Sequence, residues 1–187
     1  MDTIPPDHSL GEGVYYASEA YAGLTRRLLV IVVDVAAMLA VAFLVAILYT
    51  LAGVDVQQQA AVFWITLFII AWVYLALLKQ SRIRTIGYRL TGTRIVDLRG
   101  QRPSIRRMTL RTLLSILGPF SFPVDLIWIS VDSDRRTLRD CFVGTYVIAN
   151  DAQPVGRGEI HLTYFWAFGY TLTYPHVLRP LLAAKGS

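Results

Sequence analysis

Residues 28–51 form a run of 24 apolar or hydroxyl-bearing residues that a single charge, Asp34, interrupts. A helix needs about 20 such residues to cross the hydrocarbon core of a bilayer, so the run predicts a membrane-spanning helix. This prediction places Asp34 inside the bilayer, where a carboxylate near the helix centre costs on the order of 2.5–3.5 kcal/mol. We therefore expect Asp34 to be paired, neutralised or facing water.

A second apolar run, residues 60–78, follows a short link that carries one charge, Asp55. Its nineteen residues are uncharged, so it predicts a second membrane-spanning helix, antiparallel to the first. The chain of 187 residues is 55% hydrophobic with a mean hydropathy of +0.48, which is typical of a small integral membrane protein. The lipid bilayer is therefore its first expected partner.

Residues 79–111 carry ten Lys or Arg and one acid, Asp97. Because cytoplasmic loops collect Lys and Arg, this excess predicts that the loop and the N-terminus face the cytoplasm. The same bias explains the net charge of +5, so we expect no nucleic-acid partner. We expect contacts with anionic lipid headgroups rather than a specific anion site, and we assign these contacts to four residues: Arg82, Arg84, Arg106 and Arg107.

Residues 113–131 are long and apolar enough for a third span, but Pro119 and Pro123 break the run in its middle. The arginines that follow would lie outside if the run crossed the membrane: Arg135, Arg136 and Arg139. In addition, residues 93–98 and 143–148 have strand patterns, and pairing them requires both on one side of the membrane. We therefore predict a proline-broken helical hairpin that re-enters the membrane from the cytoplasm, in preference to a third membrane element.

The predicted fold class is an all-α membrane protein with two transmembrane helices, this hairpin and a small cytoplasmic two-strand β element. Residues 1–20 are predicted as a flexible tail and residues 21–150 as the membrane domain. Residues 151–187 form an aromatic extension, because six of the fifteen residues 160–174 are Phe, Trp or Tyr. We expect the extension to lie at the membrane interface or to dock onto another protein, in preference to forming a fourth, tilted membrane helix.

Arg27 precedes Asp34 by seven residues, or roughly 10 Å along a helix, which is too far for direct contact. Two hypotheses for Asp34 remain. It forms a permanent ion pair with a basic residue of the returning hairpin (Arg135, Arg136 or Arg139), or it exchanges a proton for a cation where water reaches it. We favour the permanent pair, because a lone intramembrane acid offers no visible relay.

Two further acids have both structural and functional interpretations. Asp125, beside the second proline break, caps the second half-helix or adds a carboxylate to the site of Asp34. Asp140 caps a short helix or pairs with Arg136, four residues before it, unless it belongs to the same site.

Cofactor and enzyme chemistry find little support in the sequence. Cys141 is the only cysteine, and His161 and His176 have no other ligand types close by, so we expect no metal and no cofactor. No Ser/His/Asp or Cys/His arrangement is apparent. We therefore do not expect an enzyme.

Three stretches, residues 21–34, 85–97 and 134–145, resemble the motifs of the RDD family of small bacterial membrane proteins. By motif, the Arg and two Asp for which that family is named fall on three residues: Arg27, Asp34 and Asp140. The chain departs from the family pattern at Ile86, where Pro is usual, and at Arg139, where His is frequent.

The resemblance implies a place in the bacterial inner membrane and a transport role, with cation/proton antiport for some members. Our first functional hypothesis is therefore a transport-related protein that uses the Arg/Asp/Asp constellation, and that forms homo-oligomers because two spans and a hairpin hardly enclose a pathway. Four charges would support that site: Asp125, Arg135, Arg136 and Arg139. The second hypothesis is a non-catalytic accessory or assembly subunit of a larger membrane complex, because the aromatic extension lies outside the resemblance.

Overall fold

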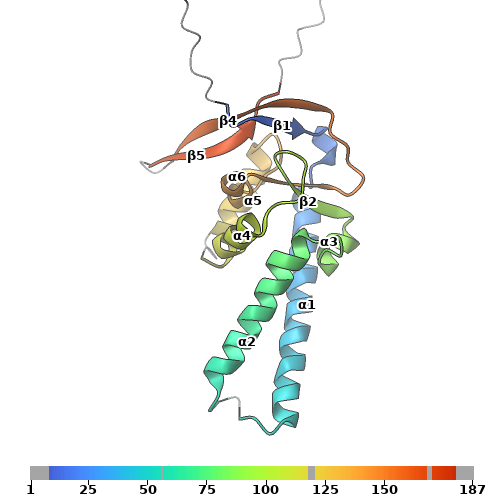
Figure 1. Cartoon of the computed structure of the whole chain (residues 1–187), viewed down its shortest axis with the longest axis vertical. Coiled ribbons are helices and arrows are strands. Elements are labelled where there is room, and N and C mark those ends of the chain that lie inside the picture. Colours follow the sequence, from blue (N-terminus) through green and yellow to red (C-terminus); the bar gives the residue numbers. More distant parts are fainter. Residues whose placement is uncertain (1–8, 56, 118–120, 168–169, 180–187) are drawn as a thin grey trace, which may run out of the picture.

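The computed structural model describes residues 9–55, 57–117, 121–167 and 170–179. Figure 1 shows a long helical hairpin that projects from a mixed helical and stranded part, which we call the head. The hairpin comprises residues 24–78, and the head comprises the other described residues.

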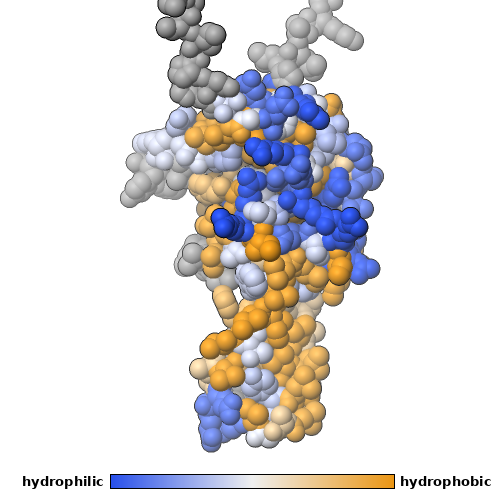
Figure 2. All heavy atoms as spheres, viewed as in Figure 1, coloured by the Kyte–Doolittle hydropathy of each residue, from blue (hydrophilic) through white to orange (hydrophobic). Residues whose placement is uncertain are grey.

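Two long helices form the antiparallel hairpin. Helix α1 spans Leu24–Leu51, while α2 spans Ala60–Trp72 and continues directly into the π-helix η2, Val73–Leu78. Their outer side chains are apolar and uncovered, with Leu39 66% and Phe43 69% exposed, and Figure 2 shows the hairpin as mostly hydrophobic surface. An apolar surface of this extent is stable in lipid and unfavourable in water. Both predicted spans are confirmed as helices of spanning length and composition.

The predicted two-strand element is also confirmed. Strand β2, Thr93–Asp97, pairs antiparallel with β3, Thr145–Ala149. The register places Thr93 opposite Ala149 and Asp97 opposite Thr145. Both strands therefore lie on one side of the hairpin, as the pairing requires.

Four short helices fill the head: α3, Ile86–Leu90; α4, Ile105–Leu117; α5, Ser121–Val131; and α6, Leu138–Val143. Helix α4 packs against η2, and α5 packs against α1 and α6. Each of α4 and α5 is shorter than the about 20 residues that a span needs, and the predicted break at Pro119 lies outside the described residues. Their insertion into the bilayer as a re-entrant pair stays a prediction.

The all-α prediction is wrong for the extension. Strand β4, Gly156–Ala167, pairs antiparallel with β5, Tyr170–Val177, and on its other side with β1, Glu12–Tyr15. This three-stranded sheet lies at the end of the molecule opposite the α1–α2 connection (Figure 1). A fourth membrane helix is therefore excluded for the described residues of this segment. The expected N-terminal tail contributes β1 and the 3-10 turn η1, Ser18–Ala20, and residues 1–8 lie outside the described residues.

Two buried clusters join these elements. The first contains the rings of Tyr16, Tyr21 and Tyr146, which meet edge to face with centroids 5.4–6.3 Å apart. It packs the sheet onto β2 and β3. The second cluster connects α1, η2, α3 and α4 through apolar side chains that include Val30, Ala76 and Met108. The second cluster lies where the hairpin meets the head, and the candidate site adjoins it.

Candidate functional site

Asp34 accepts hydrogen bonds from three groups of the hairpin and head. Its Oδ1 atom accepts from the Tyr74 hydroxyl and from the Gly87 backbone N–H, both at 3.0 Å. Its Oδ2 atom accepts from the Thr85 hydroxyl at 3.1 Å. The Lys79 Nζ atom lies 3.3 Å from the same Oδ2. Asp34 is 4% exposed, so nearly all of its interactions are those within the protein.

Gly87 allows α3 to lie directly on α1. A Cβ atom added there would lie 2.6 Å from the Val30 carbonyl oxygen and 2.8 Å from Asp34 Oδ1, closer than real contacts permit. Only a residue without a side chain lets this backbone N–H reach the carboxylate. The stretch that begins at Thr85 therefore has a structural role in binding Asp34.

Asp34 lies near one end of the membrane hairpin and not at its middle. Its cation, Lys79, directly follows the second span, Ala60–Leu78. Asp34 precedes Leu51 by 17 residues, which is roughly 25 Å along a helix. A hydrocarbon core is about 30 Å thick, so the carboxylate sits close to the boundary on the head side.

The expected pairing of Asp34 with the returning hairpin is wrong. The side chain of Arg136 instead pairs with Asp132 at 3.0 Å, and Arg139 Nε lies 2.9 Å from Asp125 Oδ2. The side chain of Arg135 is exposed. The physical reason is the hairpin geometry, because the antiparallel second helix brings Lys79, which follows it, to the level of Asp34.

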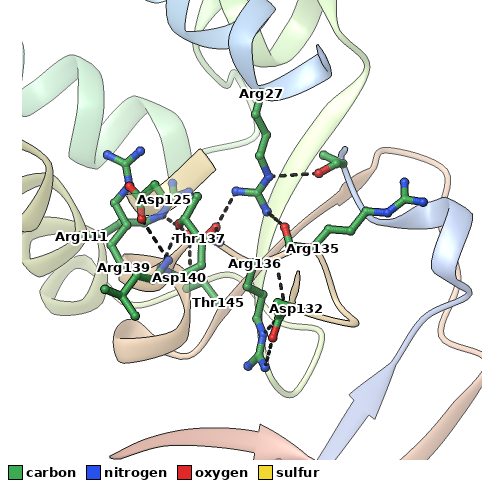
Figure 3. A network of polar contacts seen from close by, with 12 residues as sticks. Arg27, Arg111, Asp125, Asp132, Arg135, Arg136, Thr137, Arg139, Asp140 and Thr145 are labelled. Atoms are coloured by element: carbon green, nitrogen blue, oxygen red, sulfur yellow. Dashed lines mark hydrogen bonds and ion pairs between the residues drawn. The ribbon is translucent and has the colours of Figure 1, made fainter. Parts of the chain in front are cut away.

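Asp140 is fully buried and is the centre of a second charge cluster (Figure 3). Arg27 Nη1 lies 2.5 Å from its Oδ2, and Arg111 Nε lies 2.7 Å from its Oδ1. Asp140 also forms a capping box with Thr137 at the start of α6, and it accepts from the Thr145 hydroxyl at 3.3 Å. Burial alone would raise the pKa of Asp140, but Arg111 and Arg27 together hold it well below its ordinary value of 3.8.

Arg27 connects α1 to the head through all three parts of its guanidinium group. Its Nε donates to the Ala22 carbonyl at 3.0 Å, its Nη1 to Asp140, and its Nη2 to the Arg135 carbonyl at 2.7 Å. Figure 3 shows these three directions. The Arg and the second Asp of the predicted constellation are therefore in direct contact, while Asp34 belongs to a separate cluster.

Asp125 joins α5 to α6. It accepts a hydrogen bond from the Leu138 backbone N–H at 3.0 Å and pairs with Arg139, whose Nη1 donates to the Ser115 hydroxyl at 2.5 Å. Burial raises the pKa of Asp125, and Arg139 opposes that shift. Asp125 therefore caps α6, not the half-helix that contains it.

The four residues assigned to lipid headgroups differ in their surroundings. Arg82 and Arg106 are exposed, and Arg107 pairs with Asp97 at 3.5 Å while remaining 47% exposed. The Arg84 Nη1 atom donates within the head, to the Thr93 carbonyl at 3.1 Å and to Asn150 Oδ1 at 2.8 Å. Headgroup contact stays a prediction for all four.

A cavity of about 510 Å³ lies between the Asp34–Lys79 pair and the two arginines that pair with Asp140. Asp34 and Lys79 line one part, and Arg27, Arg111 and the Asp125–Arg139 pair line another. Apolar residues of the hairpin line the remaining wall: Val35, Met38, Leu39, Ala71 and Leu75. The cavity is thus charged toward the head and apolar toward the membrane.

The motifs and the charge pattern of the sequence do not single out the donors that hold Asp34: Tyr74, Lys79, Thr85 and Gly87. They do not single out Arg111 as a partner of Asp140 either. One signal was present for Lys79, since Asp34 lies 17 residues before the end of the first apolar run and Lys79 19 residues after the start of the second. An antiparallel hairpin brings those positions to the same level.

The hairpin has two helices of the length and composition that a membrane span needs, and charge clusters join it to the head, as expected for a small integral membrane protein. The family model of the RDD family matches residues 21–144. The chain therefore belongs to the RDD family, and the match covers all three motif residues, Arg27, Asp34 and Asp140. No curated protein and no solved structure matches the chain.

Proposed function

We propose that this protein is a transport-related membrane protein and that Asp34 with Lys79 is its ion-exchange element. The observation that supports the proposal most strongly is that this ion pair lines an open cavity at the membrane boundary. A proton or a metal cation that binds Asp34 would replace the Lys79 ammonium group as the partner of the carboxylate. The pair would then separate on binding and re-form on release.

The surroundings of the pair are suited to such an exchange. The Lys79 side chain is 17% exposed, so its ammonium group can turn from Asp34 toward the cavity. The Tyr74 and Thr85 hydroxyls bind the carboxylate as donors, and their oxygen atoms can equally coordinate a hard cation. Tyr74 belongs to the π-helix η2, and π-helical turns inside helices are frequent at functional sites.

We propose a homo-oligomer in the bacterial inner membrane, with the head in the cytoplasm. Two spans do not enclose a pathway, so neighbouring copies would complete it. The ten basic residues of positions 79–111 belong to the end of the second span and to the head, which supports the orientation. Reporter fusions at each terminus would test the orientation, because both ends of the chain should report the cytoplasm.

The experiment is a flux measurement in proteoliposomes that contain a pH-sensitive dye. Wild-type protein should move protons in response to a sodium or potassium gradient, and Asp34→Asn should lose this response. Asp55→Asn is the matched control, because it makes the same change at an exposed position in the link between the spans. Elution of each variant as the same detergent-solubilised species establishes that it is folded.

Lys79→Gln provides an independent check, since it removes the competing ammonium group and keeps the acid. Exchange should persist in this variant, with half-saturation at a lower cation concentration. Wild-type protein without any cation-driven proton movement contradicts the proposal, and so does an Asp34→Asn variant with unchanged flux.

A second candidate function is that of an accessory or assembly subunit, and the extension supports it. On β4, Leu162 is 46% exposed, and Tyr164 and Trp166 are each 71% exposed. These side chains alternate along the strand and therefore share one face of the sheet. Exposed aromatic residues on one face are frequent at protein interfaces.

The test is cross-linking and co-purification from the native membrane with a double variant, Tyr164→Ser with Trp166→Ser. A membrane partner captured by the wild type should be lost from this variant and retained by Thr173→Ser, a change at an exposed β5 position. Recovery of the same partner with both variants, or of a homo-oligomer alone, contradicts the subunit role.

A further inference from the structure

The wall of the cavity near the head contains more positive than negative charge. Arg27 and Arg111 are 7% and 8% exposed, and both pair with the single carboxylate of Asp140. This cluster therefore keeps one buried positive charge without a matching acid. The other two pairs that line the cavity, Lys79 with Asp34 and Arg139 with Asp125, each balance one charge against one.

Arg26 adds a second unmatched positive charge to the cavity wall. Its side chain is exposed, and it forms no ion pair or hydrogen bond with any of the described residues. Charges at a membrane boundary are screened less than in bulk water, because lipid and protein surround them. The unmatched cations therefore attract an anion into the cavity.

Tyr88 lines the same cavity, and the Lys79 Nζ atom lies 5.1 Å from the centroid of its ring. Burial alone would raise the pKa of its hydroxyl, but Arg111 and Lys79 shift the pKa below its ordinary value of 10.0. A net positive potential at the Tyr88 ring is the direct cause. The field near this side chain therefore favours negative groups.

Another part of the cavity wall is apolar and reaches the outer surface of the hairpin. Val35 and Leu39 line it, and they are 52% and 66% exposed on the outer surface of the first span. Ala71 of the second span lines the same region. An acyl chain can therefore enter from the bilayer without crossing water, which a free anion such as phosphate has no reason to do.

We infer that the cavity binds an anionic phospholipid of the adjoining leaflet, with its headgroup phosphate toward Arg26 and Arg111 and one acyl chain along Val35, Leu39 and Ala71. Basic pockets next to membrane helices bind anionic headgroups, and the apolar wall distinguishes a lipid from a soluble anion. The bound phosphate would neutralise the positive charge that Asp140 leaves unmatched. This lipid site does not depend on ion exchange at Asp34.

The test uses full-length protein in mild detergent, equilibrated with phosphatidylglycerol or with phosphatidylcholine and analysed by native mass spectrometry. Wild-type protein should retain phosphatidylglycerol in preference to phosphatidylcholine, which carries the same chains without net charge. Arg26→Gln should weaken phosphatidylglycerol binding about fivefold, as expected for one basic side chain near a membrane surface. Arg102→Gln, at an exposed position that does not line the cavity, should bind as the wild type does.

Two further arms separate a lipid from a free anion. Ala71→Phe fills the apolar end, so it should reduce retention of phosphatidylglycerol in protein that elutes as the wild type does. Inorganic phosphate should fail to displace the bound lipid. Equal retention of the two lipids, equal binding by Arg26→Gln and Arg102→Gln, or full displacement by phosphate would each overturn the inference. None of these readouts involves ion flux, so failure of the exchange proposal leaves them unaffected.

Discussion

The two carboxylates of the RDD motif differ in what surrounds them. Asp140 is fully buried between two arginines and caps a helix of the head. Asp34 is paired with one lysine at 3.3 Å and lines a cavity at the membrane boundary. Both acids are buried and hydrogen-bonded, so burial alone does not distinguish them. Asp140 and Asp34 differ in the number of cations that pair with them and in their access to the cavity.

On the exchange proposal, this difference separates a permanent ion pair, at Asp140, from an ion pair that can open, at Asp34. Two guanidinium groups hold Asp140 ionised at any physiological pH, and they connect α1 and α4 to α6. A buried charge of this kind is costly to uncouple, because each partner would be left unpaired. Asp34 pairs with one lysine, whose side chain is 17% exposed. Asp140 therefore holds the head on the hairpin, and on the exchange proposal Asp34 is the acid that changes partner.

The largest expected effect is that of Asp140→Asn. It leaves Arg27 and Arg111 buried without a counter-charge, so the variant should lose about 3–5 kcal/mol of stability. Thermal unfolding in detergent, followed by circular dichroism, measures the loss. Asp34→Asn should cost clearly less, because Lys79 can reach the cavity. Equal losses in the two variants would remove the distinction between the acids.

Gly87→Ala should have the next largest effect. The added methyl group meets the Val30 carbonyl and the Asp34 carboxylate, so α3 must shift away from α1 at a cost of about 1–3 kcal/mol. Gly23→Ala is the control, since its methyl group would meet only the end of the Arg135 side chain, at 3.4 Å. The same unfolding measurement applies. A Gly87→Ala variant as stable as Gly23→Ala would show that the close approach of α3 is dispensable.

Thr137→Ala tests the capping role of the Asp140 cluster without removing its charges. The Thr137 side chain accepts a hydrogen bond from the Asp140 backbone N–H at 3.2 Å, and loss of such a cap costs about 1 kcal/mol. The midpoint of chemical unfolding should fall by a corresponding amount. Thr163→Ala, on the partly buried side of β4, serves as a comparison outside the cluster. No change for Thr137→Ala would mean that the arginines alone hold the start of α6.

A smaller, pH-dependent effect is expected where the sheet meets the head. The His176 Nδ1 atom lies 2.6 Å from Arg136 Nη2, and Asp132, Asp134 and Arg179 are the other charged groups that act on it. Burial and Arg136 lower the pKa of His176 from 6.5, so folding favours its neutral form. The stabilisation is complete above pH 6.5 and decreases as the pH falls below that value.

Hydrogen exchange of the β5 amides measures this effect. Their protection should decrease between neutral and mildly acidic pH in the wild type, beyond the intrinsic pH dependence of exchange, and it should be independent of pH in His176→Gln. Protection that changes equally in both proteins would assign the effect to another group.

The smallest effect on stability is expected for an exposed ion pair on the three-stranded sheet. Glu12 and Arg157 approach to 3.6 Å, but their side chains are 74% and 78% exposed. Exposed pairs of this kind contribute about 0–1 kcal/mol. Glu12→Gln should therefore leave the unfolding midpoint nearly unchanged. A loss comparable to that of Thr137→Ala would show that β1 anchors the sheet through this pair.

The parts of the fold that depend on local pattern could be predicted from the sequence. Two long apolar runs predicted the two long helices, and two β-branched stretches predicted the pairing of β2 with β3. The three-stranded sheet could not be found in the same way. Strand β4 pairs with β1, which is more than 140 residues earlier, and its aromatic residues are equally common at membrane interfaces.

The motif residues of the candidate site could be predicted from the sequence, but their ion-pair partners could not. Arg27, Asp34 and Asp140 follow from the motif, yet the pairing depends on helix register and on a close backbone approach at Gly87. A backbone N–H that donates to a carboxylate is not marked by the side chain of its residue. The only sequence signal at this donor is that residue 87 is a glycine. Arg111 was one of ten basic residues in its region, so charge alone did not single it out.

On the exchange proposal, Asp34 changes partner while Asp140 does not. Infrared difference spectroscopy of the carboxyl groups measures this directly, by adding sodium or potassium to protein in lipid at neutral pH. Because Asp34 pairs with Lys79, we expect the carboxylate stretching bands to shift in the wild type and in Asp55→Asn as the added cation replaces Lys79, and this shift to be missing from Asp34→Asn. A wild-type spectrum without a carboxyl change, or an identical change in Asp34→Asn, would contradict the account.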